Sequence, residues 1–497
     1  MLAEPDSEMI DGFLARRHGL YIDGGWRQAT AQRRFDVHDP ATGAVIASVA
    51  EGDAADIDLA VAAARRSFDD RRWRGMSADA RSQVMWRLAE LIERNAREFA
   101  LLDVVDNGMP IGYANAIVGF CAMQLRYYAG LITKSAGRNG SPAVSHDGQR
   151  VHAYTSVEPV GVAGIIIPWN APLGALVIKV APALAAGCSL ICKPAELTPL
   201  VALRFAELAE EAGLPAGVLN VVPGFGPTAG QALVDHPDVD KISFTGSTGT
   251  GKHILAAAAG NLKRVTLELG GKSPVIVFDD ADPDITIPGA AMGIFANTGQ
   301  VCVAGSRLFV QKKSFDKVVA GIADFAGNMK IGSGLDPDNA IGPLISREQR
   351  DKVMGYIESG RKEGAEVVTG GATVDGGGYF VKPTVFANVN RDMRIVREEI
   401  FGPVLVATPI DDIDELVRAA NDTRYGLGAG IYTTDVNKAH LVADRLQAGS
   451  VWINGYGFMD PSMPFGGYKE SGWGRELGTE GMSAFQETKS VFIQLKA

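Results

Sequence analysis

From about residue 155 onwards, the sequence alternates short apolar runs rich in β-branched residues with longer segments typical of helices. A strand, a helical crossover and a second strand at this spacing build a parallel sheet. The runs are apolar without alternation, as expected of strands that helices cover on both faces. The sequence therefore predicts an α/β fold, and its first five strands are VGVAGIII (160–167), SLICK (189–193), VLNVV (218–222), DKISF (240–244) and RVTLEL (264–269).

The pattern restarts after Gly270 and Gly271, a pair that we interpret as a hinge or a domain boundary. PVIVF (274–278) opens a second α/β segment, which continues to about Gly478. We therefore expect two parallel-sheet α/β domains. The first consists of residues 1–136 and 159–269, and the second of residues 270–478.

Two further segments look like strands that lack a neighbour in either domain, GQRVHAYTSVEP (148–159) and TKSVFIQL (488–495). Open strand edges favour pairing with another chain. We therefore predict that residues 137–158 and 479–497 form a small β oligomerisation element. The expected assembly is a homodimer or a homotetramer.

Composition excludes several classes of function. The net charge of −10 disfavours binding to nucleic acid or to an anionic membrane surface. The four cysteines and seven histidines show neither zinc-site nor disulfide-framework spacing, so we expect no metal. The acidic opening MLAEPDSEMIDGF lacks the features of a signal peptide. These observations together predict a reducing, cytoplasmic setting.

One apolar stretch is long enough to span a bilayer, because Lys179 is the only charge in the 33 residues from Val160 to Cys192. Pro168, Asn170, Pro172 and Pro182 interrupt it, however, and proline in a helix interior costs about 3 kcal/mol. We interpret the stretch as a buried strand, a loop and a buried helix, and we expect no membrane span.

Several side chains are candidates for chemistry, and each has a structural alternative. Cys302, in NTGQVCVAGS, is either a nucleophile or a small packed residue. Glu268 ends a predicted strand, where open α/β sheets bind ligands, or it is a solvated edge residue. Asn170 lies in the loop PWNAP, as an oxyanion donor or as an ordinary turn residue. FTGSTGTGK (244–252) is either a phosphate-binding turn at the start of a helix or an ordinary tight turn. PGFGPTAG (223–230) resembles a dinucleotide-binding fingerprint only weakly.

Taken together, these motifs resemble the aldehyde dehydrogenase superfamily. The N-terminal stretch FLARRHGLYIDGGW (13–26) also resembles the phenylacetaldehyde dehydrogenases within it. The resemblance covers the chain from about Tyr21 to the C-terminus. The matching motifs occur in order: PWN, KPAE, FTGST, LELGGKSP, GQVC, EEIFGPV and PFGGYKESG.

The resemblance implies an oxidation of an aldehyde to a carboxylic acid. Cys302 would attack the aldehyde carbonyl as a thiolate, and the Asn170 amide would stabilise the resulting oxyanion together with the Cys302 backbone N–H. Glu268 would activate the water that hydrolyses the thioacyl enzyme. Lys179 and Glu476 match positions that relay protons. The domain at 1–136 and 159–269 would be Rossmann-like and bind the cofactor, and the domain at 270–478 would be catalytic.

The cofactor implied by the resemblance is NAD. Lys193 and Glu196 would meet the adenosine ribose, and a carboxylate at Glu196 would repel the extra phosphate of NADP, which makes NADP the less favoured cofactor. Glu399 and Phe401 would hold the nicotinamide ribose. The other implied cofactor-binding residues are Ile166, Trp169, Gly226, Gly246, Ser247, Leu269 and Gln349.

The substrate wall departs from relatives that act on small aliphatic aldehydes. Aromatic residues are replaced after Asn170, and the expected wall is apolar and roomy, which favours a bulky apolar, aromatic or terpenoid aldehyde. Three alternatives stay open: a CoA-acylating aldehyde dehydrogenase, a cysteine hydrolase without a nucleotide, and a non-catalytic binding or structural protein. The wall residues are Ala171, Gly174, Ile178, Val301, Val303, Phe458 and Met459.

Overall fold

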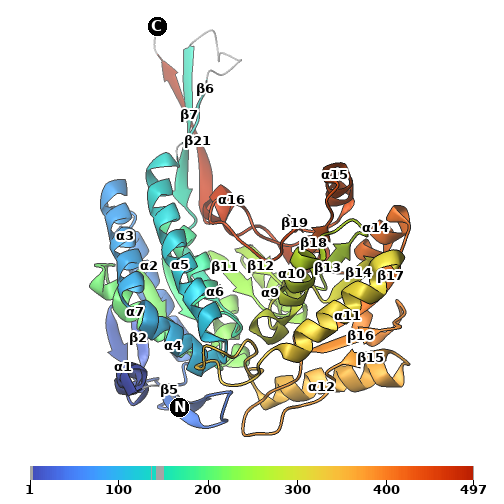
Figure 1. Ribbon diagram of the computed structural model, residues 1–497. Helices are drawn as coiled ribbons and strands as arrows, with labels where there is room; N and C mark the ends of the chain where they lie inside the picture. The colour runs from blue at the N-terminus through green and yellow to red at the C-terminus, as the bar shows by residue number, and fades with distance from the viewer. Residues whose placement is uncertain (1–3, 136, 141–149, 496–497) are drawn as a thin grey trace.

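The computed structural model describes residues 4–135, 137–140 and 150–495 (Figure 1). Parts of the predicted segments 1–136, 137–158, 148–159 and 479–497 therefore lie outside the described residues. Two large sheets, each flanked by helices, confirm the predicted α/β class. Buried apolar residues fill both faces of each sheet, as the unalternating strand sequences predicted.

Eight described strands form the first sheet, and its central strands are parallel. The hairpin β2–β3 closes one edge in the antiparallel sense, and β20, from the end of the chain, closes the other. Residues 472–473 thus join the first sheet, although they fall within the segment predicted as the second domain. In spatial order the strands are β20 (Gly472–Trp473), β12 (Arg264–Glu268), β11 (Lys241–Thr245), β8 (Val162–Ile166), β9 (Ser189–Lys193), β10 (Leu219–Val221), β2 (Leu20–Ile22) and β3 (Gly25–Arg27).

The helices around this sheet come from the first half of the chain, with one from its end (Figure 1). Helix α9 starts at an N-cap, where the Ser247 Oγ accepts a hydrogen bond from the Thr250 N–H at 3.2 Å. The helices are α1 (Glu4–Leu14), α2 (Ala54–Asp69), α3 (Ala78–Arg94), α4 (Ala96–Asn107), α5 (Ile111–Leu131), α6 (Pro172–Ala186), α7 (Leu200–Glu211), α8 (Gln231–Asp235), α9 (Thr248–Ala258) and α16 (Gly478–Ser483).

Seven described strands form the second sheet, which is parallel except at the edge strand β15. Its strands are β15 (Glu366–Thr369), β16 (Thr384–Ala387), β17 (Val404–Ile410), β14 (Arg307–Gln311), β13 (Pro274–Val277), β18 (Gly428–Tyr432) and β19 (Ser450–Ile453). Its helices are α10 (Pro283–Phe295), α11 (Lys312–Asn328), α12 (Arg347–Lys362), α13 (Arg394–Arg397), α14 (Ile413–Asn421) and α15 (Val436–Arg445).

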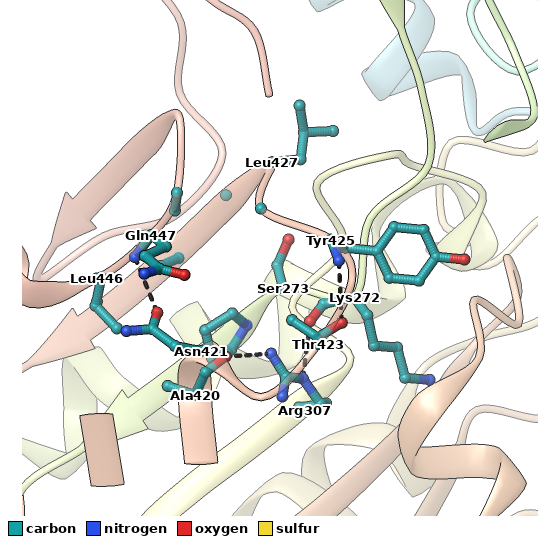
Figure 2. A pocket seen from close by; sticks show the side chains of 15 residues that line it. Lys272, Ser273, Arg307, Ala420, Asn421, Thr423, Tyr425, Leu427, Leu446 and Gln447 are labelled. Atoms are coloured by element: carbon teal, nitrogen blue, oxygen red, sulfur yellow. Dashed lines mark hydrogen bonds between the residues drawn. The ribbon is translucent and has the colours of Figure 1, made fainter. Parts of the chain in front are cut away.

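A buried cation fixes the start of β14 against the rest of the second unit. The Arg307 guanidinium donates to the carbonyl oxygens of Lys272 at 2.8 Å and Ala420 at 2.7 Å (Figure 2), and to that of Ala419 at 3.1 Å. Burial lowers the Arg307 pKa to about 10. The planar fork of donors satisfies carbonyls from two separate segments, which holds the chain that leads out of the Cys302 loop.

Two smaller sheets complete the described part. One packs beside the first unit and consists of β1 (Arg17–His18), β5 (Val45–Ala50) and β4 (Arg34–His38). In the other, which we call the arm, β21 (Gln486–Leu495) pairs with β7 (Arg150–Pro159) over ten residues, and β6 (Asn139–Gly140) lies beyond β7. The arm projects away from the body of the molecule (Figure 1).

The apolar stretch that contains Lys179 forms β8, a loop, α6 and β9, as the sequence predicted. Within the part of the chain that the structure describes, no helix is both long and apolar enough to cross a membrane.

Candidate active site

The site begins at the carboxyl ends of the parallel strands in the first sheet. Ile166 at the end of β8 pairs with Lys193 at the end of β9, and Glu268 at the end of β12 pairs with Thr245 of β11. These strand ends share one edge of the sheet because their register is continuous. Gly246, Ser247 and Leu269 follow directly, so six of the sequence-predicted residues gather at this edge, where open α/β sheets bind ligands.

Cys302 lies in a loop held in an unusual backbone conformation. Asn297, Thr298 and Gly299 have φ values of 47°, 57° and 71°, which is the left-handed region. The Thr298 hydroxyl donates to the Gly342 carbonyl at 3.0 Å, and the Gln300 Oε1 accepts from the Ile345 N–H at 2.9 Å. Backbone strain of this kind persists only where the surroundings fix it, and such sites are often functional.

Asn170 joins the first unit to the Cys302 loop. Its side-chain amide donates to the Gln300 carbonyl at 2.9 Å, and its own carbonyl accepts from the Asn297 amide at 2.8 Å. The Asn170 amide carries a second N–H, which is the one available to a ligand. One hydrogen bond that Asn170 donates and one that it accepts therefore tie this residue to the Cys302 loop, at Gln300 and Asn297.

Glu268 is 3% exposed, and neither carboxylate oxygen has a hydrogen-bond partner among the described residues. Burial raises its pKa well above the usual range, the negative charge of Glu476 raises it further, and Lys179 opposes the shift. A buried carboxyl without partners, at a strand end that faces the nucleophile loop, is a strong base whenever it is ionised.

The Cys302 thiol is half-buried. Burial raises its pKa to about 12, and the nearby carboxylates of Glu268 and Glu399 act in the same direction. The backbone N–H groups of Val303 and of Cys302 itself favour the thiolate and partly offset the shift. The resting residue is therefore a protonated thiol that needs a base or an arriving positive charge.

Behind Glu268, Lys179 and Glu476 form a buried ion pair. Lys179, from α6, also donates to the Ser243 hydroxyl at 3.3 Å. The pair thus connects α6 with β11 and with the end of the chain. The structure places the two predicted relay residues in contact with each other and electrostatically close to Glu268.

Three predicted cofactor residues meet across the two units. The rings of Trp169 and Phe401 are in edge-to-face contact, with centroids 5.3 Å apart. Phe401 has a φ of 59°, and the Gln349 amide donates to its carbonyl at 2.8 Å. Glu399, two residues earlier, is partly buried and accepts from the Gly271 N–H at 2.9 Å. Burial raises the pKa of Glu399, which this hydrogen bond opposes.

The paired glycines are explained by close packing. A methyl group at Gly270 would fall inside van der Waals distance of the Glu399 carboxylate, and one at Gly271 would clash with the Cys302 carbonyl. The pair lies between β12 of the first sheet and β13 of the second, and neither residue has a positive φ. Glycine is needed here because it lacks a side chain.

The remaining cofactor residues occupy the outer part of the same sheet edge. The Lys193 ammonium donates to the Glu196 carboxylate at 3.1 Å, and the Glu196 side chain stays 35% exposed. Gly226 opens the single π-helical turn Gly226–Gly230, and a methyl group there would meet nothing within 4 Å. Leu269 is instead buried against Gly251 of α9, in the core beneath the edge.

An apolar cluster surrounds the thiol. Of the predicted wall residues, Ile178, Val301, Val303 and Met459 belong to it, whereas Phe458 is 67% exposed and Gly174 faces Ile117. Sequence reasoning missed the aromatic members, which come from α5, from β19 and from the segment that follows β19. The spacing of Tyr113, Ile117 and Phe120 on one face of α5 was the available signal. The missed members of the cluster are Phe120, Leu427, Trp452, Tyr456, Phe465 and Leu477.

Comparison with known proteins agrees with this geometry. The model of the aldehyde dehydrogenase family matches residues 26–491. The chain is 47% identical to aldehyde dehydrogenase 1 of Tanacetum cinerariifolium, with 95% of this chain and 94% of the relative covered. It is 46% identical to phenylacetaldehyde dehydrogenase of Pseudomonas fluorescens, with 97% of each covered.

Among solved structures, an aldehyde dehydrogenase from Bacillus cereus in complex with NAD⁺ has a TM-score of 0.96 and is 46% identical, with 100% of this chain and 99% of that chain covered. The chain described here therefore belongs to the aldehyde dehydrogenase family.

The thiol environment yields a test of the charge on Glu268. Glu268→Gln removes a carboxylate that raises the Cys302 pKa, so we expect alkylation of Cys302 by iodoacetamide at pH 8 to become about three- to tenfold faster. In the unmodified protein the rate should rise nearly tenfold per pH unit below pH 10, because a pKa of about 12 lies above that range.

The control is Cys302→Ala, which should not react, because Cys121, Cys188 and Cys192 are buried. Slower alkylation of the Glu268→Gln protein would contradict this account. It would mean that Glu268 already acts as the base for the thiol in the free protein.

Proposed function

We propose that this protein oxidises an aldehyde to the carboxylic acid with NAD, through a covalent intermediate on Cys302. The observation that carries the proposal is the joint position of the Cys302 thiol, the held Asn170 amide and the buried, unpartnered Glu268 carboxyl in one apolar site. A nucleophile, an oxyanion donor and a base together suit acyl transfer.

In the first step the Cys302 thiol gives up its proton to water, its sulfur bonds to the carbonyl carbon, and the carbonyl electron pair moves onto the oxygen. The Asn170 amide and the Cys302 backbone N–H stabilise that oxyanion. NAD, when bound, accepts the two electrons of the oxidation as a hydride, which leaves the acyl group as a thioester of Cys302.

The thioester is then hydrolysed. Glu268 takes a proton from a water molecule, the water oxygen bonds to the acyl carbon, and the Cys302 sulfur leaves as a thiolate. Glu268 must lose its acquired proton before the next turnover. The Lys179–Glu476 ion pair beside it is the route that we propose for this proton.

The residues at the sheet edge fit a dinucleotide. Glu399 presents a partly buried carboxylate whose one hydrogen bond among the described residues comes from a backbone N–H, which leaves acceptor capacity for ribose hydroxyls. Trp169, Phe401 and Gln349 would line the nicotinamide side, with Ile166 and Leu269 beneath. Lys193 and Glu196 would take the adenosine ribose, beside Gly226, Gly246 and Ser247, and Glu196 favours NAD over NADP.

For the substrate we propose a bulky apolar or aromatic aldehyde. The support is the apolar cluster around Cys302, in which the side chains of Phe120, Trp452 and Phe465 offer faces and edges for an aromatic ring. The alternative of a CoA-acylating enzyme is tested by the product, because it releases a thioester only when CoA is present.

The first test follows NADH formation with acetaldehyde, hexanal, benzaldehyde, phenylacetaldehyde and a terpenoid aldehyde. We expect kcat/KM to be at least about tenfold higher for phenylacetaldehyde than for acetaldehyde, since each extra buried apolar group adds binding energy. Glu268→Gln should give a burst of one NADH per subunit and then stop, because the thioester is not hydrolysed. Cys302→Ala should give no burst.

Free acid in the absence of CoA supports hydrolysis, and turnover that requires CoA would refute it. A preference for acetaldehyde would overturn the substrate proposal and leave the reaction class intact.

Substitutions at the two paired glycines should separate an effect on NAD binding from an effect on the chemical step. Gly270→Ala should displace the Glu399 carboxylate and raise the dissociation constant for NAD about tenfold or more, with little change in kcat at saturating NAD. Gly271→Ala should displace the Cys302 backbone and lower kcat about tenfold or more, with NAD affinity nearly unchanged. The same effect from both variants would contradict the assigned contacts.

We also propose that the arm forms a homo-oligomer, dimer or tetramer. Along it, Phe492, Ile493, Leu495 and Tyr154 are 68%, 42%, 40% and 39% exposed, and β21 is an edge strand of its sheet. Exposed apolar residues on an open edge are typical of an interface. The four free cysteines accord with the reducing cytoplasm, which we propose as the location.

Phe492→Ser combined with Ile493→Ser should lower the mass measured by analytical ultracentrifugation, because it removes apolar area that a second copy would bury. Leu59→Ser, at a residue of α2 that is 38% exposed, is the matched control and should leave the mass unchanged. An unchanged mass in the arm variant, or a monomer before substitution, would refute the proposal.

A further inference from the structure

The last turn of α4 contains two polar residues in an otherwise apolar core. Asp106 and Asn107 are both fully buried, and α4 ends immediately after them at Gly108, which has a φ of 91°. Burial of such groups is costly unless they are hydrogen-bonded. Each of the two uses one side-chain atom to hold the backbone of a loop that enters the active site.

Asn107 holds the loop that carries the oxyanion donor. Its Nδ2 donates to the Trp169 carbonyl at 2.7 Å, in the peptide unit that precedes Asn170. The Asn297 amide donates to the Asn170 carbonyl, in the peptide unit that follows. The two peptide units on either side of Asn170 are therefore fixed by amides from different parts of the chain.

Asp106 holds the loop that carries Glu196. Its Oδ2 accepts from the backbone N–H of Leu200 at 3.0 Å, at the first residue of α7. The residue at the N-cap position of α7 is Pro199, which supplies no capping side chain. Asp106 thus caps α7 from another helix and fixes where the preceding loop ends.

The end of α4 also packs against the segment that holds the Cys302 loop. A methyl group at Gly108 would meet the ring of Pro343, and one at Gly342 would clash with the Gly108 carbonyl. Gly342 and Ile345 are the residues that bond to Thr298 and Gln300 of the Cys302 loop. The C-terminal end of α4 therefore contacts the loop that carries Asn170, the start of α7 after the Glu196 loop, and the segment that supports the Cys302 loop.

We propose that Asp106 and Asn107 are positioning residues with separate targets, Asn107 acting on the Asn170 amide and Asp106 on the Glu196 loop. Consecutive helix residues point in directions about 100° apart, so neighbours reach different loops. This inference rests on the proposed roles of Asn170 and Glu196. Neither positioning residue touches the substrate or the reacting atoms.

Asn107→Leu keeps the volume and removes the donor to the Trp169 carbonyl. We expect the rate constant of the NADH burst to fall about 10- to 100-fold, because a small displacement of a catalytic amide is costly. The dissociation constant for NAD should change less than twofold. Gln124→Leu, at another buried amide in the core of the first unit, is the matched control and should leave both quantities unchanged.

Asp106→Ala should weaken NAD binding and leave the burst nearly unchanged, the opposite of Asn107→Leu. We expect the dissociation constant for NAD to rise about tenfold, while the burst at saturating NAD stays within twofold. Hydrogen exchange at the Leu200 amide should accelerate in the protein without NAD, because its acceptor is lost. Asp106→Asn keeps a side-chain carbonyl as acceptor and should restore both properties.

A double-mutant cycle tests whether Asn107 acts through Asn170. In an Asn170→Ala background, Asn107→Leu should lower the burst rate no further. A further fall in that background, an equal fall in Gln124→Leu, or identical profiles for Asn107→Leu and Asp106→Ala would overturn the inference. If Asn170→Ala alone leaves the burst unchanged, the proposed oxyanion role fails, and this outcome is distinct from a failure of the positioning residues.

Discussion

The site depends on a steric constraint where the chain leaves the first sheet for the second. At Gly270 and Gly271 the backbone passes so close to the Glu399 carboxylate and to the Cys302 carbonyl that no side chain fits. The Gly271 N–H is also the hydrogen-bond donor to Glu399. The distance between the cofactor side and the nucleophile is thus set by contact with bare backbone, which deforms less than a layer of side chains.

The protonation states of the groups around Cys302 follow from the same close packing. Glu268, Glu399 and the Cys302 thiol lie close together away from water, and burial raises the pKa of all three. Groups with like charge in such a space cannot all ionise together. The Cys302 thiol therefore keeps its proton at rest, while the buried Lys179 beside Glu476 supplies a positive charge that favours the ionised form of Glu268.

Local patterns explain what the sequence could predict. The strands at 160–167 and 189–193 were recognisable because parallel strands that helices cover on both faces are largely apolar. Glu268 was recognisable as the polar residue at a strand end, and the ordered motifs identified Cys302 and Asn170. These assignments need only short stretches of chain and a rule about where parallel sheets bind ligands.

Contacts between distant segments explain what the sequence could not predict. The hydrogen bond from Asn107 to Trp169 joins residues 62 positions apart, and no local pattern marks either as a partner. The aromatic residues around the thiol were missed for a similar reason, because Phe120 and Trp452 reach it from elements that a scan of the Cys302 loop does not include. Paired glycines between strands are typical of a hinge or a domain boundary, and only the fold shows which groups Gly270 and Gly271 contact.

The pairing of β12 with β20 and of β7 with β21 has a consequence for the order of assembly during synthesis. The Lys179–Glu476 ion pair and the hydrogen bond from the Tyr128 hydroxyl to the Gly478 carbonyl likewise join the first half of the chain to residues after 470. Until residues 470–495 have left the ribosome, the first unit has an open sheet edge and Lys179 has no ion-pair partner. The N-terminal half, although made first, therefore completes its fold only after these later residues have emerged.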